Sequence, residues 1–475
     1  MTDTQFSDPY RGFAGKRLAL VESMLHAVFY DEIAAARKLG LRVHLLLRDR
    51  DWYATEEEWA DHPLTQVDEL SFVDTHSADA VLDRLTDADG WPLVDGVTTF
   101  SDYHTEVAAE VAERLGLPSP GLRAIATANH KPSLRALLDG GPYNIPFAVV
   151  TAPGQLPDVA ARLGFPLVLK PPAEAISHGV ERADDEAQLA AAYRRVAAIR
   201  QSLRGQERPG HVLVEQYVDA PEVSVESMTI AGRTHVYGIT AKRLCPPPTF
   251  LEAAHSFPAR LDPPEQAAVE RAVVEVLELM EYQQGPCHTE LKLTADGPRI
   301  VEVNPRLPAG CLTTMVRDVT GGNMHLDAKL LAVGGTPVPP GPDRHGGAAV
   351  VMLYPPPGEA ELVAVDGAGE AEAVPGVQVS LFARPGDHLW HRVDNSGRVG
   401  LVYATADDPE AALAAAERAA ALIRTTVRPL RHAETPHTEA QPAETQSTET
   451  QHAGTQSTAA GPTASTGPEQ PPRAR

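Results

Sequence analysis

The sequence predicts an α/β protein of several domains, and three observations support this fold class. In residues 17–122, short apolar runs alternate with amphipathic helical stretches, which is typical of a parallel sheet covered by helices on both faces. In residues 212–335, strand-like runs follow one another more closely. A chain of 475 residues is also too long for one hydrophobic core, so we expect about two to four domains.

Residues 1–122 are assigned to an N-terminal domain, because each strand-like run there is followed by a helical one. The apolar run RLALVE begins the sheet, and Gly40 ends the first helix before the run RVHLLL. We expect strands at 17–22, 42–47 and 95–100, and helices at 32–40, 78–87 and 105–117.

The middle of the chain divides into a mixed segment at 123–211 and a strand-rich segment at 212–335. The second segment ends in two runs, HTELKLT and RIVEVNP, which the turn residues ADG separate, and this pattern predicts a hairpin. We expect strands at 212–218, 222–230, 234–243, 288–294 and 299–305, and a helix at 265–280. The hairpin carries carboxylates on both of its strands.

The Pro/Gly-rich stretch at 334–347 marks the next boundary. We expect a small C-terminal domain at 336–430, in which four strand-like runs form a small sheet that a helix at 409–427 closes. Residues 431–475 are rich in Thr, Glu, Gln, Pro and Ala and have almost no large apolar side chains. Such a segment buries too little apolar surface to offset the conformational entropy that is lost on ordering. We therefore predict a disordered tail.

Composition excludes several classes of protein. A net charge of −23 argues against binding of nucleic acid or an anionic membrane through general electrostatic attraction. The cysteines, Cys245, Cys287 and Cys311, lack the close pairs of a zinc site and fit a reducing compartment. No apolar signal core and no apolar run of about 18 residues occurs. We therefore expect a soluble, cytoplasmic protein.

The strongest chemical signal is the predicted hairpin. Side chains two apart on a strand share a face, so Glu302, Asn304 and Arg306 project the same way, and Glu290 on the neighbouring strand can face them. Two carboxylates and an amide oxygen suit Mg²⁺, and an arginine beside them can neutralise a developing oxyanion. The alternative is a solvated edge hairpin with incidental charges, which the apolar residues of IVEVN disfavour.

A second signal is the buried run FPLVLK, which ends in Lys170 and leads into a loop with Ser177 and Gly179. The chain has only seven lysines, so a lysine in such a context is less expected by chance. The lysine can reach phosphates, and the loop offers them a hydroxyl and backbone N–H groups. An ordinary strand end remains the alternative.

A third signal is the apolar run VLVEQYV, which leads to Glu215, Gln216 and then Glu222. The edge of a strand can hydrogen-bond a nucleobase such as adenine, and a nearby carboxylate can bind ribose hydroxyls. The spacing alone leaves this assignment open.

In this order, the motifs resemble those of the ATP-grasp superfamily over residues 17–430. The resemblance implies an ATP-grasp fold with a Rossmann-like N-terminal domain, a lid at 123–211, a core at 212–335 and a small C-terminal α+β domain. It implies metal ligands at Glu290, Glu302 and Asn304, with Arg306 as the arginine that stabilises the transition state. It implies that nucleotide is bound by Lys131, Lys170, Ser177, Gly179, Glu215, Gln216, Val218 and Glu222.

A narrower resemblance is to the L-amino-acid ligases, which make dipeptides. The run ITAKR contains Lys242, beside the phosphate site and expected to be catalytic, and the run FLEAAHSFPA contains Glu252 and His255, three residues apart. In this group these positions recognise the amino-acid substrate, although His255 as a loop histidine satisfied by backbone remains an equal alternative. Ala309 stands where a glycine is common, and its methyl group is expected to restrict the substrate pocket.

The activity that the resemblance implies is ATP-dependent formation of an amide bond between a carboxylate and an amine, through an acyl phosphate, with release of ADP and phosphate. ATP and one or two Mg²⁺ ions, or Mn²⁺, are the implied cofactors, and a homodimer is common among similar proteins. Two alternatives stay open: a ligase acting on a carrier-bound or non-amino-acid carboxylate, and a non-catalytic ATP-binding module.

Overall fold

The computed structural model describes residues 10–23, 28–54, 59, 62–246, 249–341, 343–356, 358–389 and 394–430. The predicted disordered tail at 431–475 lies outside the described residues. All described helices and strands belong to the first of two units, Met1–Pro429 and Leu430–Arg475. In the described part of the chain, none of the helices is both long and apolar enough to cross a membrane.

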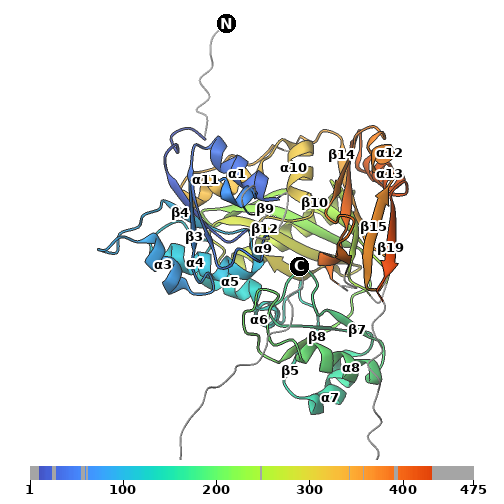
Figure 1. The fold of residues 1–475 in the computed structure, drawn as a ribbon. Coiled ribbons are helices and arrows are strands. Elements are labelled where there is room, and N and C mark those ends of the chain that lie inside the picture. Colours follow the sequence, from blue (N-terminus) through green and yellow to red (C-terminus); the bar gives the residue numbers. More distant parts are fainter. Residues whose placement is uncertain are drawn as a thin grey trace, which may run out of the picture. The chain divides into compact units, whose positions relative to one another are not determined.

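The N-terminal sheet has four parallel strands in the order β3-β2-β1-β4, as the alternation of strands and helices predicts (Figure 1). Leu18, Leu20 and Leu45 are fully buried in it, because helices cover both faces. The strands are β1 (Arg17–Val21), β2 (Arg42–Leu47), β3 (Glu69–Phe72) and β4 (Gly96–Thr98), and the helices are α1 (Val28–Lys38), α3 (Ala78–Leu85) and α4 (Thr105–Arg114).

A second sheet, in the order β5-β8-β6-β7, forms the lid with two helices packed on it. Strand β8 pairs here, with β5 and β6, although its sequence was assigned to the following segment. An apolar run does not encode its partner, which explains the difference. The elements are β5 (Phe147–Val150), β6 (Leu167–Lys170), β7 (Glu181–Ala183), β8 (Val212–Gln216), α7 (Leu156–Leu163) and α8 (Glu186–Ala197), and α5 (Leu122–Asn129) and α6 (Lys131–Leu137) precede them.

The central element is an antiparallel eight-stranded sheet in the order β13-β12-β9-β10-β11-β14-β18-β16. Its first strands match the predicted ones closely, and the β12–β13 hairpin is confirmed (Figure 1). The strands are β9 (Glu222–Ile230), β10 (Arg233–Leu244), β11 (Glu252–Phe257), β12 (Gly285–Thr294), β13 (Gly297–Asn304), β14 (Gly347–Leu353), β16 (Val377–Leu381) and β18 (Gly400–Ala406). The helices α9 (Pro263–Leu279), α10 (Leu312–Thr320) and α11 (Met324–Ala332) pack on it.

The C-terminal region differs from the predicted separate sheet. Strands β14, β16 and β18 extend the central sheet, while β15 (Ala360–Asp366), β17 (His388–Leu389) and β19 (Arg424–Pro429) form a three-stranded sheet. The predicted helix at 409–427 is also too long, because α13 (Pro409–Ala420) ends before β19 begins. Thr425, Thr426 and Val427 are β-branched and favour the strand. A short helix, α12 (Ala368–Glu372), packs beside β16.

Candidate active site

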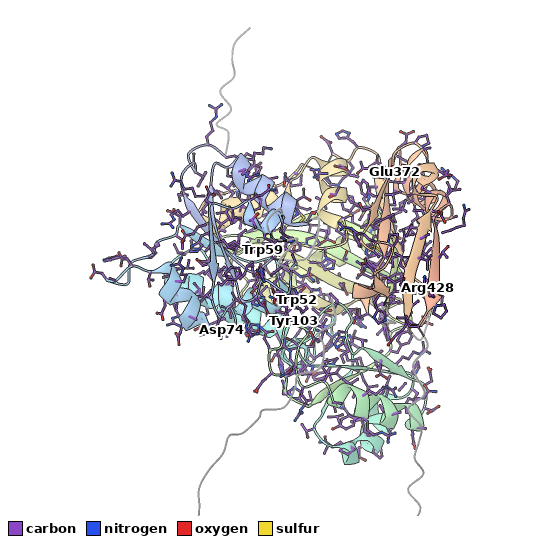
Figure 2. The ribbon with its side chains drawn as sticks, in the orientation of Figure 1. Trp52, Trp59, Asp74, Tyr103, Glu372 and Arg428 are labelled. Atoms are coloured by element: carbon purple, nitrogen blue, oxygen red, sulfur yellow. The ribbon has the colours of Figure 1, made fainter. Side chains whose placement is uncertain are left out.

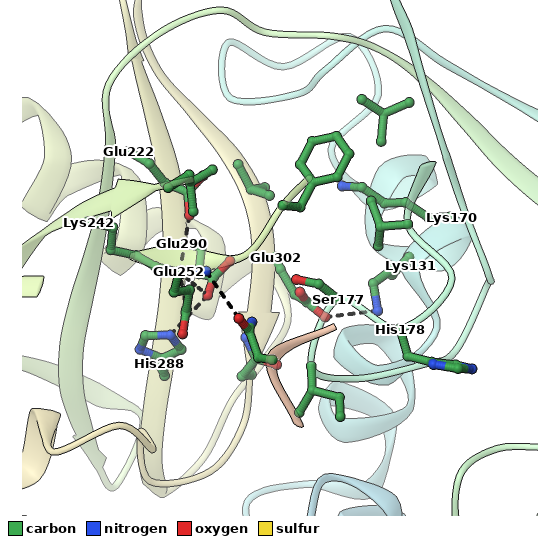
Figure 3. Close-up of a pocket in the computed structure, with 18 of the residues that line it drawn as sticks. Lys131, Lys170, Ser177, His178, Glu222, Lys242, Glu252, His288, Glu290 and Glu302 are labelled. Atoms are coloured by element: carbon green, nitrogen blue, oxygen red, sulfur yellow. Dashed lines mark hydrogen bonds and ion pairs between the residues drawn. The ribbon is translucent and has the colours of Figure 1, made fainter. Parts of the chain in front are cut away.

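One pocket, between the lid, the central sheet and residues 395–398, contains every predicted site residue except Gly179. Figure 3 shows Lys242 and Glu290 on one side of it and Lys131 and Lys170 on the other. From the central sheet, alternate residues along the strands line the pocket. From the lid, residues at the ends of β6 and β8 line it. Three signals that are far apart in the sequence therefore meet in one place.

The hairpin brings its two carboxylates together directly. Glu290 on β12 and Glu302 on β13 are cross-strand partners, as the alternation predicts. The ammonium group of Lys131, at the first residue of α6, lies 2.8 Å from Glu302 Oε1. Asn304, the last residue of β13, is buried and lines the same pocket. Helix α6, whose Leu134 packs in the core of the central sheet, is thus joined to the hairpin by an ion pair.

Arg306 lines the pocket and has a partner that the sequence did not reveal. Its guanidinium Nε donates a hydrogen bond to Asp102, in the 3₁₀ turn Asp102–His104 that follows β4, and Nη1 donates to the carbonyl of Leu307 at 3.0 Å. Burial opposes the charge, but the Asp102 carboxylate outweighs it and raises the pKa of Arg306. The N-terminal domain therefore holds Arg306 in place, and no local pattern links positions so far apart.

Lys242, on β10, is buried at the centre of a cluster of three carboxylates. Its ammonium nitrogen is 2.5 Å from Glu290 Oε1, 3.0 Å from Glu252 Oε1 and 3.1 Å from Glu222 Oε1. Burial disfavours the charge, yet these three carboxylates raise the pKa of Lys242 well above its ordinary value. Lys242 therefore stays charged and neutralises acids that would otherwise repel one another and an incoming phosphate.

His288 is a pocket residue that was overlooked. Its ring bridges Glu226, at 2.9 Å, and Glu290, at 3.2 Å. Burial would lower the pKa of His288, but the two carboxylates outweigh it and raise the pKa to about 9. The signal was present, because His288 precedes Glu290 by two positions and so shares its face of β12.

Lys170 is positioned by a buried ion-pair network. Glu215 on β8 accepts from Lys170 at 2.7 Å and from Arg135 at 2.5 Å. Burial opposes ionisation of Glu215, but the two cations outweigh it and lower the pKa of Glu215 to about 2. Both carboxylate oxygens are engaged, so Glu215 holds Lys170. Arg135 was not predicted, although it lies one helical turn after Lys131.

Three further predicted nucleotide residues lie along the same wall. Gln216 ends β8 with an exposed side chain, Val218 follows it, and both line the pocket. Glu222, at the start of β9, is buried between Lys242 and Lys292, whose ammonium nitrogen is 3.2 Å from Glu222 Oε2.

The loop after Lys170 has a strained backbone. Ile176 and Ser177 have φ values of 53° and 62°, in the left-handed region that non-glycine residues seldom occupy. Ser177 lines the pocket. Gly179 does not, but a Cβ there would lie 2.4 Å from Ile199 Cδ1, so its absent side chain permits the loop to pack. The Ile176 carbonyl accepts from the Asn395 amide at 3.2 Å.

The predicted substrate residues lie where β11 meets the C-terminal region. Glu252 bonds to Arg398 and lies 3.5 Å from His255 Nε2. Burial opposes ionisation, but Lys242 and then His255 lower the pKa of Glu252 well below its ordinary value. The His255 ring is buried, and among the described residues its Nδ1 has no hydrogen-bond partner. Ala309 also lines the pocket. Arg398 was not predicted.

The pocket contains the oxygen donors that the sequence predicts for a metal ion. Among the described residues, no group of three or more His, Cys, Asp or Glu side chains is arranged to hold a metal ion. The predicted set has only two carboxylates, Glu290 and Glu302, with the amide oxygen of Asn304. Hard oxygen donors fit Mg²⁺, which usually completes its shell with waters and substrate phosphates. The donor chemistry therefore fits a metal that arrives together with a phosphate ligand.

Models of known protein families match three segments of the chain. Residues 163–315 match the model of the ATP-grasp domain, and residues 33–119 match the ATP-grasp N-terminal domain. Residues 351–428 match the L-amino acid ligase C-terminal domain 2.

Similar proteins agree with these matches. An uncharacterized protein of Sinorhizobium fredii, y4rH, is 28% identical over 84% of this chain and 80% of its own length. Carnosine synthase 1 of Gallus gallus is 29% identical over 64% of this chain, which corresponds to 34% of that protein. The crystal structure of an L-amino acid ligase from Bacillus licheniformis has a TM-score of 0.72 at 23% identity, and covers 87% of this chain and 99% of that one.

The fold and the family matches together define an ATP-grasp ligase, an enzyme that forms C–N bonds with release of ADP. Within this superfamily, residues 351–428 match a domain of the L-amino acid ligases, and the chain is similar to carboxylate–amine ligases of this kind.

Proposed function

We propose that the protein activates a carboxylate with ATP and joins it to an amine, on amino-acid-like substrates. The observation that carries the proposal is the ion pair between Lys131 at the start of α6 and the hairpin carboxylate Glu302, beside the buried Arg306. One pocket then contains cations that can bind phosphates and oxygens that can bind a divalent ion. It also contains an arginine that can stabilise an oxyanion.

In the proposed reaction, an oxygen of the substrate carboxylate attacks the γ-phosphorus of ATP, and the bond to ADP breaks. The amine then attacks the carbonyl carbon of the acyl phosphate, and phosphate leaves with that carboxylate oxygen. Lys131 and Lys170 hold the phosphates, and Arg306 stabilises the tetrahedral oxyanion. Bound Mg²⁺, held by Glu290, Glu302 and Asn304, would neutralise charge on the phosphates.

Amino-acid-like substrates are proposed from the chemistry around Glu252 and His255. The half-buried Glu252 carboxylate and a ring nitrogen of His255 without a described partner can recognise the amino group of the activated substrate. Closure of the lid over the pocket would keep water from the acyl phosphate.

The proposal is tested by ADP release with ATP and Mg²⁺ against amino acids, singly and in pairs, with mass spectrometry of the products. We expect a condensed product to accompany ADP, and Glu302→Gln to lower turnover by roughly a hundredfold or more, because a charged ligand of the proposed Mg²⁺ site is lost. Glu278→Gln, which changes an exposed residue of α9, should leave turnover unchanged. Folded protein that binds ATP but releases no ADP with any pair would contradict the amino-acid substrates.

A further inference from the structure

Lys292 is a pocket lysine to which neither the nucleotide nor the metal assignment gives a role. It lies on β12, and its side chain is 13% exposed. The register of the sheet places Glu222, on β9, directly between two lysines, because its cross-strand partner on β12 is Lys292 and its partner on β10 is Lys242. Three neighbouring strands thus present a cation, a carboxylate and a second cation in one row.

The two lysines hold different oxygens of the Glu222 carboxylate. The ammonium nitrogen of Lys242 is 3.1 Å from Oε1, and that of Lys292 is 3.2 Å from Oε2. A carboxylate oxygen can accept about two hydrogen bonds, so each oxygen keeps one acceptor position. Glu222 is also buried, and Figure 3 shows it beside Lys242 in the pocket. The arrangement leaves two acceptor positions, one on each oxygen, at a fixed place in the pocket wall.

Two adjacent acceptor oxygens match a ligand with two adjacent hydroxyl groups. The ribose of a nucleotide carries such a vicinal diol, whose two O–H groups can each donate a hydrogen bond to one oxygen of a carboxylate. The same pocket has apolar residues that can receive a base, namely Ile145, Val168, Val218 and Val301. Glu222 comes soon after Val218 in the chain, so an acceptor for ribose follows the apolar wall directly.

Lys292 serves Glu222 alone, whereas Lys242 is shared. The Lys242 ammonium nitrogen lies 2.5 Å from Glu290 and 3.0 Å from Glu252, and both distances are shorter than the one to Glu222. Among the described carboxylates, Lys292 pairs only with Glu222. Without Lys292, the Glu222 carboxylate would keep a single, shared cation and would be free to turn toward it.

We propose that Lys292 is a positioning residue that fixes Glu222 as the acceptor for both ribose hydroxyls of the nucleotide. The Lys292 ammonium group is itself fixed, because it donates to the carbonyl of Ala220, just before β9, at 3.1 Å. These two partners also make a phosphate contact a poorer fit for Lys292. The pocket therefore selects ribonucleotides over deoxyribonucleotides. The inference rests on ATP binding in this pocket and goes beyond the proposed function, since it involves neither the carboxylate nor the amine.

The test compares the binding of ATP and of 2′,3′-dideoxy-ATP, by calorimetry with Mg²⁺ and with no carboxylate or amine present. We expect the unaltered protein to bind the dideoxy nucleotide about 10- to 100-fold more weakly, the effect of losing hydrogen bonds to a charged acceptor. In Lys292→Met, the ratio of the two Kd values should fall by about tenfold. Loss of a positive charge near the phosphates raises both Kd values alike, so it cancels in the ratio. Binding of the dideoxy nucleotide shows that the variant is folded.

A double variant separates positioning from direct contact. If Lys292 acts through Glu222, then Lys292→Met should change the Kd ratio by less than about twofold when Glu222→Gln is already present. The double variant removes both members of a buried pair and leaves no uncompensated charge, so it stays measurable even if Lys292→Met alone does not fold. Arg299→Gln is the matched control, because Arg299 lies directly across from Lys292 on β13 but does not line the pocket, and it should keep the ratio of the unaltered protein.

Three outcomes would overturn the inference. If Lys292→Met keeps the Kd ratio of the unaltered protein, Lys292 does not position Glu222. If the double variant loses clearly more discrimination than Glu222→Gln alone, Lys292 contacts the ribose itself. If the unaltered protein binds both nucleotides equally well, Glu222 does not accept from the ribose, although the proposed function stands. A folded protein that binds neither nucleotide would instead contradict the proposed function, and the inference would fail with it.

Discussion

At the residue scale, the site is a set of buried charges that neutralise one another before any ligand binds. Lys242 pairs with three carboxylates, and Glu215 pairs with two cations. Removing one partner from such a set leaves an uncompensated buried charge, which is more costly than the loss of an exposed pair. The same residues therefore determine both the geometry of the site and part of the stability.

Glu215→Gln is expected to lower the free energy of unfolding at neutral pH by about 3 kcal/mol, because Lys170 and Arg135 lose their buried counter-charge. The folded-state pKa, about 2, lies below the ordinary 4.5. This stabilisation is therefore fully present above pH 4.5 and is lost as the pH falls toward 2. Urea denaturation of both proteins across this range should show the difference shrinking on acidification. A constant difference, or none, would contradict the assignment.

At the element scale, the sequence predicted where the strands lie better than it predicted which strands pair with one another. The bounds of β2 and β9 were predicted correctly, because β2 is a nearly continuous apolar run and β9 alternates apolar with polar residues over most of its length. The assignment of β8 to the lid sheet and of β14 to the central sheet depends on pairing between distant segments, which local patterns do not contain. The ionic partners of Arg306 and Glu252 were missed for the same reason, whereas His288 could have been found from its spacing.

Gly179→Ala is expected to distort the loop that carries Ser177, because the new methyl group would meet Ile199 and Pro171 and because φ at this position is +71°. We expect the KM for ATP to rise about tenfold or more, since strain of this kind costs about 1–3 kcal/mol. Gly154→Ala is the control, because nothing lies within 4 Å of a Cβ there. An unchanged KM would show that the loop does not contact the nucleotide.

At the scale of the whole molecule, the lid is fastened to the N-terminal domain by the segment between α8 and β8. Arg204 forms a buried ion pair with Glu22 at 2.6 Å, and its guanidinium lies over the ring of Trp52 at 4.4 Å. Gln206 donates to the carbonyl of Tyr103 at 2.6 Å. Trp52 and Tyr103 are both labelled in Figure 2. These contacts favour the closed arrangement that the proposed reaction needs.

Arg204→Ala should loosen this attachment, because Glu22 would lose the guanidinium of its buried ion pair. We expect amide hydrogen exchange in residues 198–211 to become at least about tenfold faster than in the unaltered protein. Arg194→Ala, at an exposed position of α8, is the matched control. Equal exchange in the two variants would mean that Arg204 does not hold the lid.

In the proposed reaction, a substrate carboxylate is activated as an acyl phosphate in this pocket. This step is tested most directly by supplying the carboxylate substrate with both oxygens as ¹⁸O and analysing the phosphate that is released. We expect one ¹⁸O atom in each phosphate that accompanies a condensed product, because the attacking oxygen leaves with phosphorus. Condensation and ADP release that yield phosphate without ¹⁸O would contradict it.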